Sequence, residues 1–141
     1  MKLAIITDQH FGARKGADYI HKYFKKFYDN IFFPYLEKNK IDTVVDMGDT
    51  FDNRRNIDLA TLEWAKKNYY DRLRSMGIKV HTIVGNHTAY YKDTNEINTV
   101  ELLLKEYDNV EIYAEPTTIN IGGLDILMMP WINEENKLQT L

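Results

Sequence analysis

The sequence predicts an α/β protein whose parallel strands are flanked by helices. Two observations carry this prediction. Short apolar runs rich in β-branched residues alternate with longer amphipathic stretches along the 141 residues, and each of the first three runs ends at a polar cluster. In sheets of this kind ligands bind beyond the carboxyl ends of the strands, so the polar clusters are the first place to look for a site.

The first half of the chain alternates strand and helix. Residues 2–7 form an apolar, β-rich run that predicts a strand buried on both faces, and residues 41–47 predict a second buried strand. Helical spacing predicts a helix over 17–40, which Pro34 must kink or restart, and a second helix over 58–76. The apolar residues that set these two periods are Ile20, Phe24, Phe27, Ile31 and Tyr35 in the first helix, and Leu59, Leu62, Tyr69, Leu73 and Met76 in the second.

The second half begins with a third strand, predicted over 78–84. A helix is predicted over 94–107, because Asp93 and Thr94 are good capping residues and apolar residues follow at helical spacing. Strands are predicted at 110–114, 118–122 and 124–131, and the pair Gly122-Gly123 indicates a hairpin.

Composition excludes several classes of protein. The net charge of −3 argues against binding nucleic acid through bulk positive charge, so any contact with DNA must be local. With no cysteine, the chain has no disulfide, thiolate zinc site or cysteine nucleophile. Its apolar runs are too short for a signal peptide or a membrane helix, so we expect a cytoplasmic protein with no membrane partner.

Three polar clusters, one after each of the first three strands, carry metal-ligand residue types. They are DQHFG at 8–12, GDTFD at 48–52 and GNH at 85–87. Oxygen and nitrogen ligands without thiolate suit Mn²⁺, Mg²⁺, Fe²⁺ or Zn²⁺. Taken singly, each cluster is more often a turn or a helix cap than a metal site. Their occurrence at three successive strand ends favours a shared metal site.

In these motifs the sequence resembles the calcineurin-like metallophosphoesterases, whose ordered D-x-H, G-D-x-x-D and G-N-H appear here as DQH, GDTFD and GNH. FG after the first motif and the form GDTFDNRR are similar to SbcD-type nuclease subunits of bacteria and phages. The resemblance implies a fold of mixed β sheets flanked by helices. It makes residues 1–141 the amino-terminal part of a nuclease domain, and we expect the chain to be truncated.

The resemblance also assigns roles to individual residues. Asp8 and His10 would bind a first metal ion, Asn86 a second, and Asp49 would bridge the two, as a shared anion must where two cations lie close together. His87 would be catalytic, stabilising the transition state or protonating the leaving oxygen. The remaining assignments have equally good alternatives. Asp52 either orients His87 or is a turn residue, and four basic residues either hold DNA phosphates or are solvated charges: Arg14, Lys15, Arg54 and Arg55.

The family completes its metal site with later histidines, yet none follows His87 here, so the second site is expected to be incomplete. The resemblance implies a Mn²⁺-dependent DNA exonuclease and endonuclease subunit of double-strand-break repair or recombination, acting by two-metal phosphodiester hydrolysis. Its implied partners are DNA, an SbcC-type coiled-coil ATPase and a second copy docked through 58–76 and 94–107. Trp64, Tyr69 and Tyr70 are either interface or core residues. The alternatives are a calcineurin-like phosphatase or cyclic-nucleotide phosphodiesterase, or an inactive dimerisation fragment.

Overall fold

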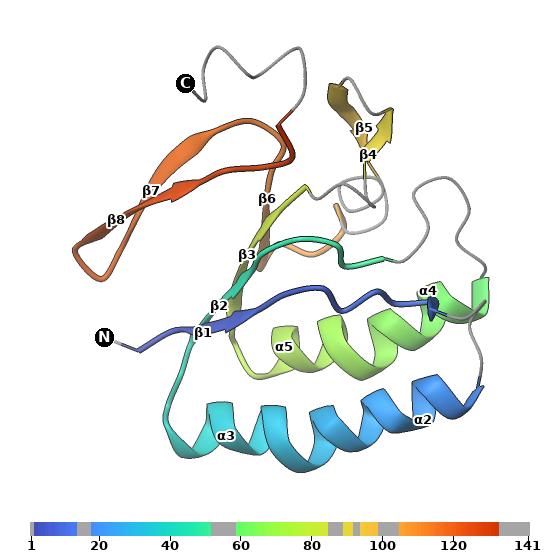
Figure 1. Cartoon of the computed structure of the whole chain (residues 1–141). Helices are drawn as coiled ribbons and strands as arrows, with labels where there is room; N and C mark the ends of the chain where they lie inside the picture. Colours follow the sequence, from blue (N-terminus) through green and yellow to red (C-terminus); the bar gives the residue numbers. More distant parts are fainter. Residues whose placement is uncertain are drawn as a thin grey trace.

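A four-stranded parallel sheet organises the molecule, as the sequence predicts (Figure 1). The computed structural model describes residues 2–13, 18–51, 59–84, 89–91, 94–98 and 105–132. The sheet has the order β1-β2-β3-β6, and every neighbouring pair is parallel. Its strands are β1 (Ala4–Ile6), β2 (Thr43–Asp46), β3 (Lys79–Ile83) and β6 (Val110–Tyr113).

Both predicted helices between the first three strands are present, each interrupted by a π-helical segment. The first stretch runs through α2 (Asp18–Phe27), η1 (Tyr28–Phe32) and α3 (Phe33–Lys38), and Pro34 stands in the first turn of α3, as its fixed φ allows. The second runs through α4 (Leu59–Ala65), η2 (Lys66–Tyr70) and α5 (Asp71–Ser75). The two stretches lie side by side below the sheet in Figure 1. Among the described residues no helix is long and apolar enough to cross a membrane.

The π-helical segments change which residues face the core. A π turn holds more residues than an α turn, so one face of each stretch repeats every four residues rather than every 3.6. Side chains packed in the core therefore follow that spacing, at Phe24, Tyr28, Phe32 and Leu36 in the first stretch and at Thr61, Ala65, Tyr69 and Leu73 in the second. The α period picks out Ile31 and Tyr35 instead, which are 61% and 59% exposed.

The core is built from aromatic rings around Phe11, in the loop after β1. Phe11 is 1% exposed, and its ring centroid lies 5.8 Å from that of Phe51, in the loop after β2, and 5.6 Å from those of Trp64 and Tyr69. Tyr69 and Tyr70 are completely buried and Trp64 packs against the cluster. Of the two predicted roles for these three aromatics, the core role is confirmed. Phe11 therefore fixes the loop that carries Asp8 and His10.

The predicted helix over 94–107 is wrong at its start. Residues Thr94–Asn98 form strand β5, which pairs antiparallel with β4 (Ala89–Tyr91). Thr and Asn are poor helix formers and Tyr favours strands. The segment therefore pairs with the preceding strand, although its apolar residues have helical spacing. Residues 99–104 and the capping position 93 lie outside the described residues.

The three carboxy-terminal strand predictions are confirmed. The first is β6, and the other two form an antiparallel hairpin of β7 (Thr117–Ile121) and β8 (Leu124–Met128), which turns at Gly122-Gly123. The hairpin lies above the sheet in Figure 1, on the side away from the helices. The backbone N–H of Trp131 donates a 2.7 Å hydrogen bond to the carbonyl of Val84, which ties the segment after β8 to the end of β3.

Candidate metal centre

The loops that follow β1 and β2 are joined to each other through their backbones. Three N–H groups of the first loop donate to carbonyls of the second, from Asp8 to Gly48 at 3.0 Å, from His10 to Asp49 at 2.9 Å, and from Phe11 to Thr50 at 2.8 Å. The parallel pairing of the strands thus continues past their ends as far as the bridge between Phe11 and Phe51. This continuation brings two of the predicted motifs to the same place.

The three predicted ligands in these loops have an unusual backbone conformation. Asp8, His10 and Asp49 have φ of 52°, 47° and 53°, in the left-handed region that residues with a Cβ rarely adopt. Gly48, directly before Asp49, has φ of 105°, which favours glycine. Strain of this kind persists where the surrounding structure holds it and is concentrated at functional sites.

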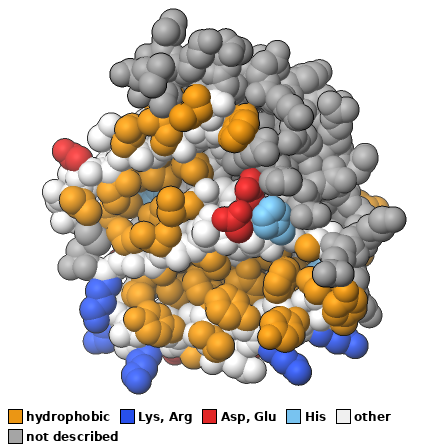
Figure 2. Space-filling view, viewed as in Figure 1, with side chains coloured by type: hydrophobic (Ala, Val, Ile, Leu, Met, Phe, Trp, Pro, Cys, Tyr) orange, Lys and Arg blue, Asp and Glu red, His pale blue; other side chains and the backbone are white. Residues whose placement is uncertain are grey.

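The side chains of these three residues converge. One ligand atom from each of Asp8, His10 and Asp49 lies within 4.8 Å of the others, a grouping that could hold a metal ion. His10 Nε2 is 3.4 Å from Asp8 Oδ1, and the side chains of Asp8 and His10 are 58% and 27% exposed, so an ion can enter from solvent. Figure 2 shows acidic side chains beside a histidine near the middle of the face in view.

The donor set fits a hard or borderline divalent ion. The Thr7 hydroxyl donates a 2.7 Å hydrogen bond to Asp8 Oδ2, and this bond holds the pKa of Asp8 below its ordinary value, with a smaller contribution from His10. Asp8 is therefore an ionised acceptor at neutral pH. Two carboxylates and one imidazole suit Mn²⁺, Mg²⁺, Fe²⁺ or Zn²⁺, and leave positions open for water or substrate.

A buried carboxyl lies behind the cluster, and sequence reasoning missed it. Asp46, the last residue of β2, is fully buried. It accepts hydrogen bonds from Gln9 Nε2 at 2.8 Å, from the Gly48 N–H at 3.1 Å and from Thr50 Oγ1 at 3.2 Å. Burial raises the pKa of Asp46 to about 7. Its signal in the sequence is an acidic residue between the apolar Val45 and Met47, near the end of a strand predicted to be buried.

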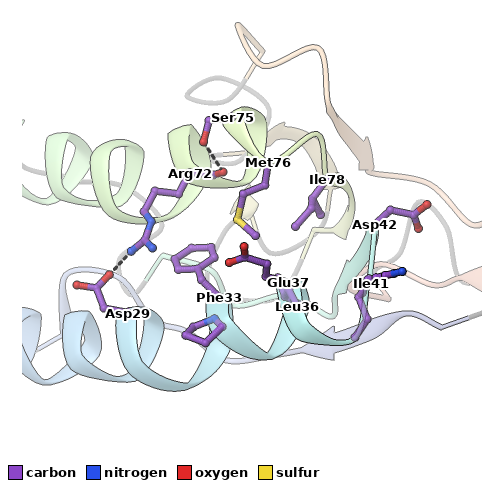
Figure 3. A pocket seen from close by; sticks show the side chains of 12 residues that line it. Asp29, Phe33, Leu36, Glu37, Ile41, Asp42, Arg72, Ser75, Met76 and Ile78 are labelled. Carbon is purple, nitrogen blue, oxygen red and sulfur yellow. Dashed lines mark hydrogen bonds and ion pairs between the residues drawn. The ribbon is translucent and has the colours of Figure 1, made fainter.

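A pocket between α3 and α5 lies near the amino-terminal ends of the strands, at the opposite end of the sheet from the Asp8 cluster. It has a volume of about 770 Å³, and its lining includes Ile41 and Ile78, which precede β2 and β3 (Figure 3). At one side of the pocket, Arg72 forms an ion pair with Asp29 and lies over the ring of Phe33. Because ligands of parallel sheets bind at the carboxyl ends of the strands, the Asp8 cluster is the better candidate site.

Comparison with known proteins agrees with this geometry. The sequence model of the calcineurin-like phosphoesterases matches residues 1–135. The chain belongs to this family. It is 37% identical over 138 residues to exonuclease subunit 1 of enterobacteria phage T4, covering 96% of this chain and 40% of that protein. It is 27% identical over 135 residues to the putative phosphoesterase 078R of invertebrate iridescent virus 3, covering 94% of this chain and 36% of that protein.

The other predicted site residues lie outside the part of the chain that the structure describes. They are the ligand Asn86, the catalytic residues Asp52 and His87, and the basic residues Arg14, Lys15, Arg54 and Arg55. Their roles stay predictions. The two remaining histidines have other surroundings: His21 stacks on Trp64 with ring centroids 4.8 Å apart, and His81 Nδ1 lies 2.8 Å from the Tyr113 hydroxyl.

Proposed function

We propose that this chain is the amino-terminal part of a metal-dependent nuclease subunit that hydrolyses phosphodiester bonds in DNA. The observation that carries the proposal is the convergence of Asp8, His10 and Asp49 from two loops that follow neighbouring parallel strands. Membership of the calcineurin-like phosphoesterase family supports the phosphoester chemistry, and the likeness to an exonuclease subunit favours DNA as the substrate.

In this proposal Asp8, His10 and Asp49 would hold one Mn²⁺ ion, and Asp49 and Asn86 would contribute to holding a second. Divalent ions supply Lewis-acid stabilisation of phosphoryl charge and lower the pKa of coordinated water. His87, oriented by Asp52, assists at the phosphate, and the basic residues of the two loops contact the DNA backbone. The chain spans about two fifths of the length of the phage T4 relative. In this proposal the second ion also needs ligands other than Asp49 and Asn86.

The proposed partners follow from the same likeness. The relative is named a subunit, which favours an assembly with other chains, and we propose an SbcC-type ATPase and a second copy of this protein. The helical surface proposed for the second copy is limited to residues 58–76, because Thr94–Asn98 is a strand. The cellular role in this proposal is double-strand-break repair or recombination.

Calorimetric titration with Mn²⁺ tests the metal site without a guess at substrate. The unchanged chain should bind Mn²⁺, and Asp49→Ala should abolish or greatly weaken that binding. Asp42→Ala is the matched control, because Asp42 is an exposed carboxylate just before β2, at the end of the strand away from the cluster. Equal binding by both variants would contradict the proposed site.

The substrate class is tested in a separate experiment, which uses the full-length protein. Mn²⁺-dependent cleavage of single-stranded DNA is compared with cleavage of a chromogenic phosphate monoester. The proposal expects Asp49-dependent cleavage of DNA and little of the ester. The opposite preference would favour the phosphatase or cyclic-nucleotide phosphodiesterase alternative.

A further inference from the structure

Four buried polar side chains form a continuous hydrogen-bond network beneath the cluster of Asp8, His10 and Asp49. The Tyr28 hydroxyl in η1 donates to Gln9 Oε1, Gln9 Nε2 donates to Asp46, and the Thr50 hydroxyl also donates to Asp46. All four residues are at most 6% exposed. The hydrogen-bond network therefore reaches from the helical layer, through the loop after β1 and the end of β2, to the loop after β2.

Asp46 is the central residue of this hydrogen-bond network. Its Oδ2 accepts from Gln9 in the first loop and from Thr50 in the second, while its Oδ1 accepts the backbone N–H of Gly48. Gln9 stands between the ligands Asp8 and His10, and its side chain is buried where those of its neighbours are more exposed. Removing the carboxylate would leave three buried donors without their acceptor, which is costly.

The neighbouring backbone needs such support. Asp8, His10 and Asp49 all have positive φ, a strained backbone conformation that persists only where the surrounding structure holds it. The backbone hydrogen bonds between the loops fix their separation. The side chain of Asp46 adds a second attachment on the inner side of both loops, directly beneath the ligands.

We propose that Asp46 is a positioning residue that holds both ligand-bearing loops in the arrangement that brings Asp8, His10 and Asp49 together. The inference rests on the proposed metal-dependent function, because the positions of Asp8, His10 and Asp49 affect that function by allowing them to bind a metal ion. Asp46 itself is fully buried and is not one of the three residues whose ligand atoms converge. It acts through Gln9 on the first loop and through Gly48 and Thr50 on the second.

Two substitutions separate hydrogen bonding from filling of space. Asp46→Leu keeps a side chain of similar size and accepts no hydrogen bond. Asp46→Asn keeps the hydrogen-bond network: once the amide of Gln9 flips, the new amide nitrogen donates to Gln9 Oε1 and to Thr50 Oγ1, and the new oxygen accepts from Gly48. Asp46→Asn should therefore rescue most of what Asp46→Leu loses.

Thr82→Val is the matched control. Thr82 lies opposite Asp46 in the register of β2 and β3 and is 1% exposed. Its hydroxyl has no hydrogen-bond partner among the described residues, and valine has nearly the same shape. A general effect of substituting a buried polar residue at this point of the sheet should appear in Thr82→Val as well.

The first readout needs no metal. Amide hydrogen exchange is followed by NMR in the metal-free 141-residue chain, at His10 and Phe11, whose N–H groups donate to the second loop. Asp46→Leu should exchange at these amides at least about tenfold faster, because an unsupported loop opens locally. The amide of Val80, bonded to the Asn109 carbonyl in the sheet, is the internal reference and should not change.

The second readout is Mn²⁺ affinity at pH 7.5. Removing groups that orient metal ligands costs roughly 10- to 100-fold in affinity, which is the loss expected for Asp46→Leu. Asp46→Asn and Thr82→Val should stay close to the unchanged chain. Tyr28→Phe removes only the far end of the hydrogen-bond network and should give a smaller loss in both readouts.

The outcomes decide between three situations. The proposal is overturned if Asp46→Leu matches Thr82→Val in both readouts, or if Asp46→Asn loses as much as Asp46→Leu. If the unchanged chain does not bind Mn²⁺, the proposed metal function fails, and the exchange rates still decide whether Asp46 holds the loops. If Asp46→Leu does not fold, Tyr28→Phe decides in its place: unchanged exchange and affinity would overturn the proposal.

Discussion

The backbone N–H of His10 donates a 2.9 Å hydrogen bond to the carbonyl oxygen of Asp49, so two residues 39 positions apart are joined through the main chain. Both have positive φ, and both side chains contribute to the cluster that could hold a metal ion. The parallel pairing of β1 with β2 therefore does more than build a sheet. It sets the separation of the two loops and hence the distances between ligand atoms.

Replacing Asp8 should weaken metal binding without unfolding the protein. Asp8 is exposed, and Asp8→Asn removes its negative charge while keeping its size. We expect a loss of Mn²⁺ affinity of about tenfold or more, measured by calorimetric titration. The melting temperature of the metal-free chain should change little, since surface substitutions usually alter stability by less than about 0.5 kcal/mol. Unaltered affinity would remove Asp8 from the site.

Asp46 should make stability depend on pH. Burial raises the pKa of its carboxyl from 3.8 to about 7. Between these values the folded protein keeps a proton that the unfolded chain has lost, so stabilisation from this group is lost as pH rises through about 7. Urea unfolding at about pH 5 and pH 8 should show that the unchanged chain loses about 2 kcal/mol more than Asp46→Asn. Parallel behaviour of the two proteins would argue against the raised pKa.

A methyl group at Gly12 should disturb the loop that carries His10. Gly12 has φ of 90°, and an added Cβ would lie 3.0 Å from Cγ2 of Thr61 in α4. Gly77 also has positive φ, of 71°, but nothing lies within 4 Å of an added Cβ. Chemical unfolding should show Gly12→Ala to be less stable than Gly77→Ala by about 1–3 kcal/mol, the usual cost of overpacking. Equal losses would mean that Thr61 moves aside freely.

Truncation of Leu73 tests the buried face of the second helical stretch. Leu73 in α5 is fully buried, so Leu73→Ala should cost about 2–5 kcal/mol. Leu59 has the same side chain in the neighbouring α4 but is 83% exposed, and Leu59→Ala should cost less than about 0.5 kcal/mol. Both apolar residues belong to the predicted helical stripe. Similar losses in denaturant unfolding would contradict the observed burial.

Much of the fold could be predicted from local pattern. Short runs rich in β-branched residues mark β1, β2 and β3, and Gly122-Gly123 marks the turn between β7 and β8. Two elements could not be predicted in this way. The start of the segment 94–107 pairs as a strand, although its apolar residues have helical spacing, and the buried faces of both helical stretches follow a four-residue repeat. Strand pairing and π turns depend on neighbours that a periodicity does not contain.

The sequence by itself determined which residue types follow the first two strands. The residue types and order of DQH and GDTFD predict Asp8, His10 and Asp49 as ligands and indicate the family to which the chain belongs. Only the tertiary structure decided how these residues meet: a left-handed backbone at each of the three, hydrogen bonds between the two loops, and a buried Asp46 bonded to both loops. The physical reason is that ligand types are properties of single residues, whereas convergence depends on contacts between residues far apart in the chain.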